Sequence, residues 1–353
     1  MTVDYIIIGQ GICGTWLEYY LLKENKSFIV YDNNYLQSAS SIAGGLINPV
    51  TGRRVVTTWM AEALLPFVWD EYSALGNTLN TQCIDQKNIL VFPSATDLQQ
   101  AFLERIKQQN SFIQPPSVPG ETLHNTFNFP FDVFEISPGY VIKMQALLQS
   151  FRAHLKEKNI LREEVFNEDE LKINGNDVEY NGIKAGKLIY ANGMHASQSR
   201  YWKNLPFVQN KGQALVVHIE GLDTSYIYKF GHLTLIALQE NEWWVGSSNE
   251  LEFATITPTD DFKTRTVASL KSILKKDFKV INHWSALRPA TVERRPFVGF
   301  HPQYKNIGIL NGMGSKGCSL APWFAKQLVQ NMLYDEPLDA LADVSRFAKV
   351  LAR

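Results

Sequence analysis

The feature that most constrains this chain is a glycine-rich turn between two apolar runs near its start. The first run, residues 5–8, leads into Gly9-Gln10-Gly11-Ile12-Cys13-Gly14, and the second run, residues 28–31, ends in Asp32. A helical pattern with apolar residues on one face fills residues 12–24. This is the strand, turn, helix, strand order of a dinucleotide-binding fingerprint. The sequence therefore predicts that a dinucleotide binds at this turn.

The small and acidic residues of the turn each have a physical task. Gly9 permits the tight turn, Gly11 lets the backbone approach a pyrophosphate, and Gly14 lets the helix pack closely on the strand. The free amides at the start of the helix attract the phosphates. Asp32 is placed to accept a hydrogen bond from a ribose hydroxyl, which suits NAD or FAD. The alternative interpretation is a glycine-rich turn without a ligand.

Composition narrows the class of protein. At 353 residues the chain exceeds what one core usually organises, so we expect two domains. A net charge of −1 argues against a general nucleic-acid surface. No run approaches the roughly 18 apolar residues of a membrane span, and the first strand begins at once, so we expect no membrane segment and no secretory signal. The cysteines and histidines lack metal or redox spacing, so we expect no metal and a cytoplasmic protein.

The order of patterns along the chain predicts a discontinuous arrangement. Residues 186–193 and 307–312 are further apolar runs that end in glycine. Residues 213–246 read as short antiparallel strands, and the prolines of residues 114–131 indicate a loop. We therefore predict an α/β fold (α+β overall), in which a Rossmann-like dinucleotide domain is interrupted by an inserted antiparallel-sheet substrate domain. The first comprises residues 1–80, 140–200 and 290–353, and the second comprises residues 81–139 and 201–289.

Eight short motifs in order along the chain resemble one family. They are the fingerprint with Asp32, Ser40-Ser41-Ile42-Ala43-Gly44-Gly45, Gly139-Tyr140-Val141, Val165, Ala191-Asn192-Gly193, Lys211-Gly212-Gln213, the pair Leu287-Arg288-Pro289 and Pro296-Phe297-Val298-Gly299, and Gly312-Met313-Gly314-Ser315-Lys316-Gly317. Over nearly the whole chain they resemble the D-amino-acid oxidase, glycine oxidase and sarcosine oxidase group of FAD-dependent oxidoreductases. The resemblance implies that the dinucleotide is FAD.

The resemblance also implies which residues hold FAD. It places the Ser40–Gly45 segment beneath the flavin and a backbone group of Val165 at the adenine. Glycine lets a backbone approach a flat, bulky ring, although an ordinary flexible loop is the alternative. The residues expected to contact the cofactor are Gly9, Gln10, Gly11, Ile12, Cys13, Gly14, Asp32, Ser40, Ser41, Gly44, Gly45, Val165, Ala191, Asn192, Gly193, Arg288, Gly312, Gly314, Ser315, Lys316 and Gly317.

Three residues are candidates for the chemistry. The resemblance gives Arg288 the role of binding a substrate carboxylate, which a guanidinium does in two-pronged fashion; a structural ion pair is the alternative. Lys316, in a loop before a helix, would stabilise negative charge on the flavin pyrimidine, unless it is simply solvated. Tyr228, like Tyr226, lies in the expected sheet over the flavin, where a hydroxyl would help to orient the carboxylate.

Three functions remain open at this point. The first is FAD-dependent oxidation of a small carboxylated amine by hydride transfer to flavin N5. The second is oxidation of the carboxymethylaminomethyl group of a tRNA wobble uridine. The C-terminal loop of the chain resembles that of the oxidase domain that acts on this base, but the net charge of the chain weighs against this function. The third is a flavoprotein without catalysis. Four arginines, Arg53, Arg54, Arg294 and Arg295, would bind a second anionic group if they point inward, or are solvated turn charges. The substrate, electron acceptor and oligomeric state stay open.

Overall fold

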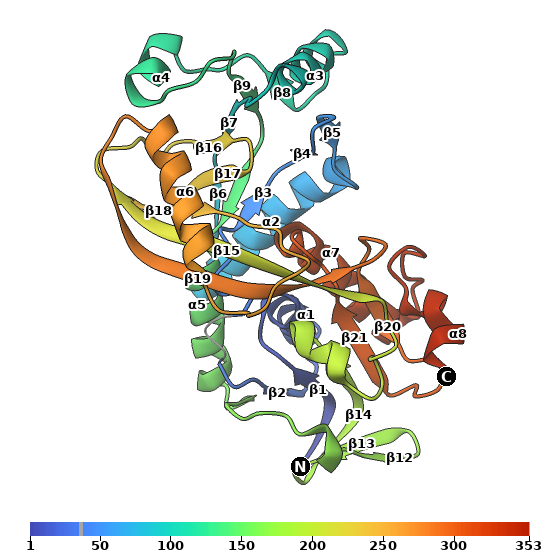
Figure 1. The fold of residues 1–353 in the computed structure, drawn as a ribbon. Helices are drawn as coiled ribbons and strands as arrows, with labels where there is room; N and C mark the ends of the chain where they lie inside the picture. Colours follow the sequence, from blue (N-terminus) through green and yellow to red (C-terminus); the bar gives the residue numbers. More distant parts are fainter. Residues whose placement is uncertain (35–37, 353) are drawn as a thin grey trace.

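A mostly parallel sheet forms one half of the protein (Figure 1). The computed structural model describes residues 1–34 and 38–352. The strands run in the order β11-β2-β1-β14-β13-β12, and β21 and then β20 extend the sheet from β14. We call it the parallel sheet. Its strands are β1 (Thr2–Ile8), β2 (Phe28–Tyr31), β11 (Leu161–Arg162), β12 (Lys172–Asn174), β13 (Asp177–Tyr180), β14 (Ile183–Tyr190), β20 (Phe297–Phe300) and β21 (Ile307–Asn311).

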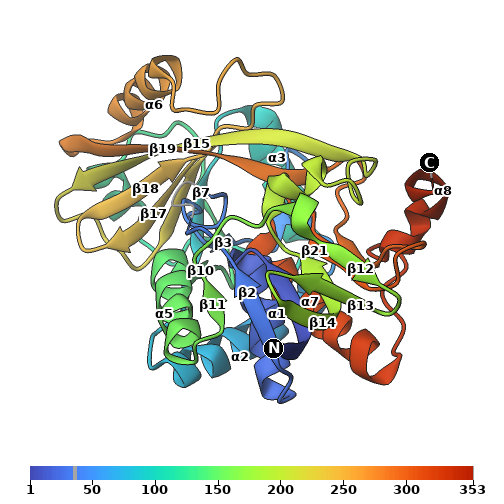
Figure 2. The ribbon, with the colours of Figure 1, turned by 90° about the horizontal axis from the view of Figure 1, so that it is seen from below.

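Four helices cover one face of this sheet and a second apolar cluster covers the other, which explains why its central strands are apolar on both faces. Helix α1 contacts β1, α5 and α7, and α2 contacts α5 and α7 (Figure 2). Strand β2 and the last four residues of β1 are buried throughout, as expected of parallel strands covered on both sides. The helices are α1 (Ile12–Lys23), α2 (Ala61–Leu79), α5 (Met144–Glu157) and α7 (Gly317–Tyr334).

A second eight-stranded sheet lies over the carboxyl end of the first, and we call it the roof sheet (Figure 1). Its order is β19-β15-β18-β17-β16-β7-β9-β8. Its outer face packs with α4 (Gly120–Thr126) and α6 (Asp260–Ile273) in a separate apolar cluster. Its strands are β7 (Ile89–Phe92), β8 (Ile113–Gln114), β9 (Phe134–Ile136), β15 (Phe207–Ile219), β16 (Ile227–Phe230), β17 (Leu233–Gln239), β18 (Glu242–Gly246) and β19 (Phe278–Thr291).

Smaller elements connect the two sheets. A three-stranded sheet has the order β3-β10-β6, and β4 pairs with β5. These elements and the remaining helices are β3 (Leu46–Ile47), β4 (Val50–Thr51), β5 (Val56–Thr57), β6 (Ile84–Gln86), β10 (Tyr140–Ile142), α3 (Thr96–Lys107), α8 (Ala348–Leu351) and the 3₁₀ turns Glu168–Glu170, Gly193–Gln198 and Val344–Phe347. Across residues 1–34 and 38–352, no helix combines the length and apolarity that a membrane crossing requires.

The structure confirms the α/β class and corrects three local expectations. The segment 114–131 contains α4, whose Leu123 is buried, because its first three prolines all precede the helix. The roof sheet is not purely antiparallel, since β16 pairs in parallel with β7. The long strand β19 was not foreseen; it tolerates Pro289 because it lies at the edge of the sheet. The domain boundaries stay a prediction.

Helix α1 carries a buried acid. Glu18 is fully buried, and neither carboxyl oxygen has a hydrogen-bond partner among the described residues. Burial, reinforced by the charge of Asp32, raises the pKa of Glu18 well above its ordinary value, and Arg152 only partly opposes this. Burial therefore favours the neutral form of this acid.

We predict that Glu18→Gln flattens the pH dependence of stability. Because the folded-state pKa of Glu18 is raised, its contribution is full below the unfolded-state pKa of about 4.3 and is lost as pH rises above it. The urea midpoint of the parent protein should therefore fall more between pH 4.5 and pH 8 than that of the variant. Glu62→Gln, at an exposed position of α2, is the matched control and should follow the parent. Parallel curves for all three proteins would refute the assignment.

Candidate cofactor and substrate site

Four parallel strands end at one edge of the parallel sheet, and the fingerprint residues follow them. Strands β1, β2, β14 and β21 lead into Gly9, Asp32, Ala191-Asn192-Gly193 and Gly312. The register places β14 between β1 and β21, so these turns are neighbours in space. Ligands of open α/β sheets bind outside the carboxyl ends of such strands.

The glycines of the first turn are required by contacts within the protein. Gly9 has a φ of +99°, and a Cβ there would lie 2.7 Å from Cα of Asn192 in the neighbouring turn. A Cβ on Gly14 would overlap the carbonyl oxygen of Gly9. The turn after β1 therefore touches both its own helix and the turn after β14. This leaves the first amides of α1 facing the space beyond the sheet edge.

A buried arginine fixes Asp32 at the end of β2. Nη1 of Arg152 donates to Oδ1 of Asp32 at 2.7 Å and to the side-chain oxygen of Gln10 at 3.2 Å. The backbone amide of Gln10 donates to Oδ2 of Asp32 at 2.8 Å. The carboxylate is thus held in place beside the fingerprint. Arg152 itself is 8% exposed, and the sequence analysis had not identified it.

The Ser40–Gly45 segment reaches the start of α1 and is fastened to the roof sheet. Oγ of Ser40 accepts from the amide of Ile12 at 3.0 Å, and Nε1 of Trp244 donates to the carbonyl of Ile42 at 3.0 Å. A Cβ on Gly44 would lie 2.8 Å from the Trp244 ring, and a Cβ on Gly45 would overlap the carbonyl of Ile142. Protein packing on the Cβ side is therefore a further reason for glycine here, and approach to a flat ligand stays a prediction.

The C-terminal glycine loop closes the same edge. The side-chain amide of Asn311 donates to the carbonyl of Gly193 at 2.9 Å, which joins the turns after β14 and β21. The amide of Gly314 donates to the carbonyl of Pro289 at 2.9 Å, which joins this loop to the roof sheet. Lys316 is the last residue before α7, and burial, with Arg295 nearby, lowers the pKa of its ammonium group.

One cavity of about 1130 Å³ runs between the two sheets. It exceeds the roughly 300–1,000 Å³ of ordinary small-molecule pockets, as an extended cofactor with a substrate requires. Most of the residues expected to hold FAD line it. These are Gly9, Gln10, Gly11, Ile12, Cys13, Asp32, Ser40, Ser41, Gly44, Gly45, Val165, Ala191, Asn192, Gly193, Arg288, Gly314, Ser315, Lys316 and Gly317. Gly14 and Gly312 do not line it, and their role is to pack the turns.

Arg288 lies in the cavity with its side chain laid across the neighbouring strand. It is paired with Asn210 in the ladder between β19 and β15. Nη1 donates to Oδ1 of Asn210 at 3.1 Å and to the carbonyl of Ser248 at 3.0 Å. The guanidinium crosses β15 directly over Gly212, where a Cβ would overlap it. Burial lowers the pKa of Arg288, but an arginine remains cationic over the physiological range.

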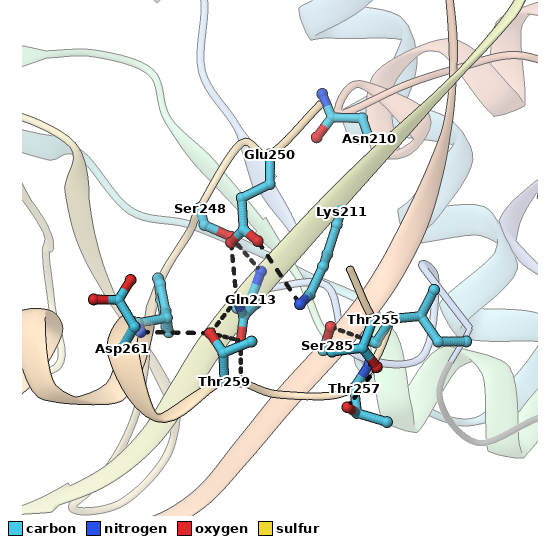
Figure 3. A network of polar contacts seen from close by, with 12 residues as sticks. Asn210, Lys211, Gln213, Ser248, Glu250, Thr255, Thr257, Thr259, Asp261 and Ser285 are labelled. Carbon is cyan, nitrogen blue, oxygen red and sulfur yellow. Dashed lines mark hydrogen bonds and ion pairs between the residues drawn. The ribbon is translucent and has the colours of Figure 1, made fainter. Parts of the chain in front are cut away.

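A polar network behind β15 holds the segment that receives Arg288 (Figure 3). Lys211 is 1% exposed and lies 3.7 Å from Oε2 of Glu250, while their backbones exchange two hydrogen bonds. The side chain of Gln213 donates to Glu250 at 2.8 Å and accepts from the amide of Thr259 at 2.8 Å. Lys211 and Gln213 of the Lys211-Gly212-Gln213 motif thus hold the segment that follows β18 and contains Glu250. The glycine between them leaves room for Arg288.

The structure corrects the expectation for Tyr228. This residue is 3% exposed, does not line the cavity, and belongs to the apolar cluster on the outer face of the roof sheet. Its hydroxyl donates to the carbonyl of Asp223 at 2.9 Å, and the hydroxyl of Tyr226 lies 3.1 Å from Oγ of Ser117. The sequence could not fix the register of this strand, and the alternation of β16 turns Tyr228 outward.

The four arginines of the two turns do not enter the cavity. Arg53, Arg54 and Arg294 are exposed, and Arg295 stacks on Trp59 with its Cζ 4.1 Å from the ring centre. They are therefore charged residues of the turns rather than ligands of a second anionic group, which was the simpler of the two alternatives.

Sequence reasoning missed several cavity residues of the roof sheet. Lys229, His232 and Thr234 come from β16, β17 and the turn between them, and Trp244 comes from β18. A signal was present, because Tyr228 and Phe230 are apolar at a spacing of two and Lys229 lies between them. If one face of the strand is core, the lysine must face the other way.

Comparisons with known proteins agree with this geometry. The family described as "FAD dependent oxidoreductase" matches residues 4–331. Glycine oxidase of Bacillus subtilis (strain 168) is 22% identical over 351 residues, covering 90% of each chain. Among solved structures, iminodiacetate oxidase from Chelativorans sp. BNC1 superposes with a TM-score of 0.79 at 19% identity, over 96% of this chain and 98% of that one. Glycine oxidase from Geobacillus kaustophilus gives 0.78 at 16% identity, over 98% of both chains. The chain belongs to the D-amino-acid-oxidase family of FAD-dependent oxidoreductases, and FAD is its cofactor.

Proposed function

We propose that this protein oxidises a small carboxylated amine, of the amino-acid or N-alkyl-glycine type, with FAD as hydride acceptor. One observation carries the proposal: the half-buried guanidinium of Arg288 lies in the cavity lined by the residues expected to bind the cofactor, with part of its donor set unused. When bound, FAD supplies the redox chemistry by accepting a hydride at N5. The chain must bind the amine, orient its α-C–H bond and exclude water.

The geometry of Arg288 supports a defined mode of carboxylate binding. Both hydrogens of Nη1 are engaged by Asn210 and Ser248, while among the described residues Nε and Nη2 make no hydrogen bond. These two nitrogens form one edge of the planar guanidinium, and that edge matches the two oxygens of a carboxylate. A carboxylate held in this way has a fixed rotation, and the adjacent α-carbon is positioned with it.

The charges around the cavity favour a neutral amine. Besides Arg288, the cations Lys229 and Lys316 line the cavity. Nearby positive charge disfavours the protonated form of an amine and so lowers its pKa. A neutral nitrogen retains the lone pair that hydride loss from the adjacent carbon requires. In this arrangement no separate catalytic base is needed.

The start of α7 and Lys316 would stabilise the negative charge of a reduced cofactor. The helix begins at Gly317, and Cys318 and Ser319 line the cavity with it. A helix N-terminus and an adjacent ammonium group stabilise negative charge that develops near them. They would therefore favour the reduced cofactor. Cys318 is buried and its thiol pKa is raised to about 12, which disfavours the thiolate that covalent attachment would need.

Two other functions remain as alternatives. Oxidation of a tRNA wobble uridine rests on the exposed arginines of the turns, and it requires a salt-sensitive shift of tRNA in a gel. A flavoprotein without catalysis predicts that no amine reduces the flavin. A cytoplasmic location, expected from the sequence, also stays a prediction.

We predict that the purified protein is yellow and that its flavin is bleached anaerobically by at least one carboxylated amine. The panel comprises glycine, sarcosine, D-amino acids, proline and, as substrates lacking nitrogen, 2-hydroxy acids. Arg288→Ala should abolish bleaching while FAD stays bound, since the carboxylate anchor is lost and the fingerprint is intact. A colourless folded protein, or normal bleaching of the variant, would contradict the proposal.

We predict that Gly212→Ala lowers kcat/KM by roughly 100-fold, because the added methyl displaces the guanidinium that crosses this position. The FAD content should not change, since Gly212 is remote in sequence from the fingerprint turns. Gly120→Ala is the matched control, because a Cβ there meets nothing within 4 Å. Steady-state kinetics and flavin absorbance measure both properties. Equal activity of the two variants would refute the crossing geometry.

We predict that Tyr228→Phe leaves kcat/KM unchanged. The variant removes one hydrogen bond on the outer face of the roof sheet, so it should cost about 1 kcal/mol of unfolding free energy. Urea unfolding and steady-state kinetics measure the two effects. A large loss of activity at unchanged stability would return Tyr228 to the substrate site.

A further inference from the structure

Lys229 is a cation in the cavity without a counter-charge. It lies on β16 between Tyr228 and Phe230, both of which face the outer cluster, so its side chain is on the cavity face. Among the described residues, its ammonium group makes no hydrogen bond or ion pair. Burial lowers the pKa of this ammonium group.

Among the described residues, the two almost fully buried cations have acidic partners, whereas Arg288 and Lys316, which line the cavity like Lys229, make no ion pair. Lys211 faces Glu250 at 3.7 Å, and Arg152 faces Asp32 at 2.7 Å. Of the described residues that line the cavity, only Asp32 and Glu164 are acidic. Asp32 follows β2 and pairs with Arg152, and Glu164 comes shortly after β11, the neighbour of β2. The roof end of the cavity therefore has cations and, within the part of the chain that the structure describes, no carboxylate.

Polar groups surround Lys229 on the same face. Thr234 is its direct cross-strand partner, and His232 lies in the turn that joins their strands. All three line the cavity. An ammonium group, a hydroxyl and an imidazole can each donate a hydrogen bond to an anionic oxygen. Their convergence gives a set of donors around one point of the cavity wall.

The sheet register relates this point to Arg288. Lys229 lies in one row with Thr234, Gly246 and Ala214 across β16, β17, β18 and β15. The guanidinium of Arg288 lies over Gly212, two residues before Ala214 on β15, with Nη2 as its nearest atom. Three inter-strand steps of the sheet, about 14 Å, therefore separate the strand of Lys229 from the strand beneath the open edge of Arg288. A short molecule with an acidic group at each end spans such a gap, given the reach of a lysine side chain.

We propose that Lys229, with His232 and Thr234, forms a second anion subsite, so that the substrate is a small amine carrying two carboxylates. This rests on the proposed function, because Arg288 takes the first carboxylate beside the reacting carbon and the subsite takes the second. The second carboxylate supplies the counter-charge that Lys229 lacks. The exposed arginines of the turns do not share this task, since they do not line the cavity.

The test uses the FAD-loaded protein and ligands that cannot react. Linear dicarboxylates from succinate to suberate, and monocarboxylates of the same chain lengths, are titrated against the flavin absorbance. We expect at least one dicarboxylate to bind about 10-fold more tightly than its monocarboxylate, as one partly buried ion pair would give. Lys229→Met should remove this preference and leave monocarboxylate affinity unchanged, whereas Lys229→Arg should keep it. Lys279→Met, at an exposed lysine of β19, is the matched control and should behave as the parent.

Two outcomes overturn the proposal: no dicarboxylate preference in the parent protein, or a loss in Lys229→Met that is equal for both ligand series. The titration reads binding rather than turnover, so it separates the subsite from the function. A dicarboxylate preference that depends on Lys229, in a protein whose flavin no amine bleaches, would retain the subsite and refute the oxidase. Bleaching by amines without that preference would do the reverse.

Discussion

The close contact between turns at the carboxyl edge of the parallel sheet is the constraint on which the rest of the site depends. Gly14 packs on the carbonyl of Gly9, and Gly9 packs on Asn192. Asn311 then ties the third turn to Gly193. Because Gly9 and Gly14 carry no side chain, segments from the start, middle and end of the chain can meet at one point. The cofactor site is the surface that this meeting leaves open.

Much of this arrangement could be predicted from the sequence because it depends on local chemistry. The spacing of Gly9, Gly11 and Gly14 between apolar runs predicts a strand, a turn and a helix, and the structure has them at those residues. The later runs that end in glycine predicted β14 and β21 in the same way. In each case the neighbours that matter are a few residues away in the chain.

What escaped prediction depends on contacts distant in sequence. The alternation of Tyr228, Lys229 and Phe230 puts the lysine opposite the two aromatic residues, but only the packing of the roof sheet against α4 and α6 turns the aromatic face away from the cavity. Arg152 meets Asp32 across 120 residues, and no pattern within α5 indicates the pair. Gly44 lines the cavity as expected of a ligand-facing residue, but the packing of its Cβ side against Trp244, two hundred residues later, could not be foreseen.

The fastening of the roof sheet on two sides has a consequence for exchange of the cofactor. Trp244 is bonded to the carbonyl of Ile42, and the carbonyl of Pro289 receives the amide of Gly314. These two hydrogen bonds attach the roof sheet both to the Ser40–Gly45 segment and to the C-terminal glycine loop. A flavin that left by separation of the roof from these segments would break both hydrogen bonds, which would couple its release to local unfolding.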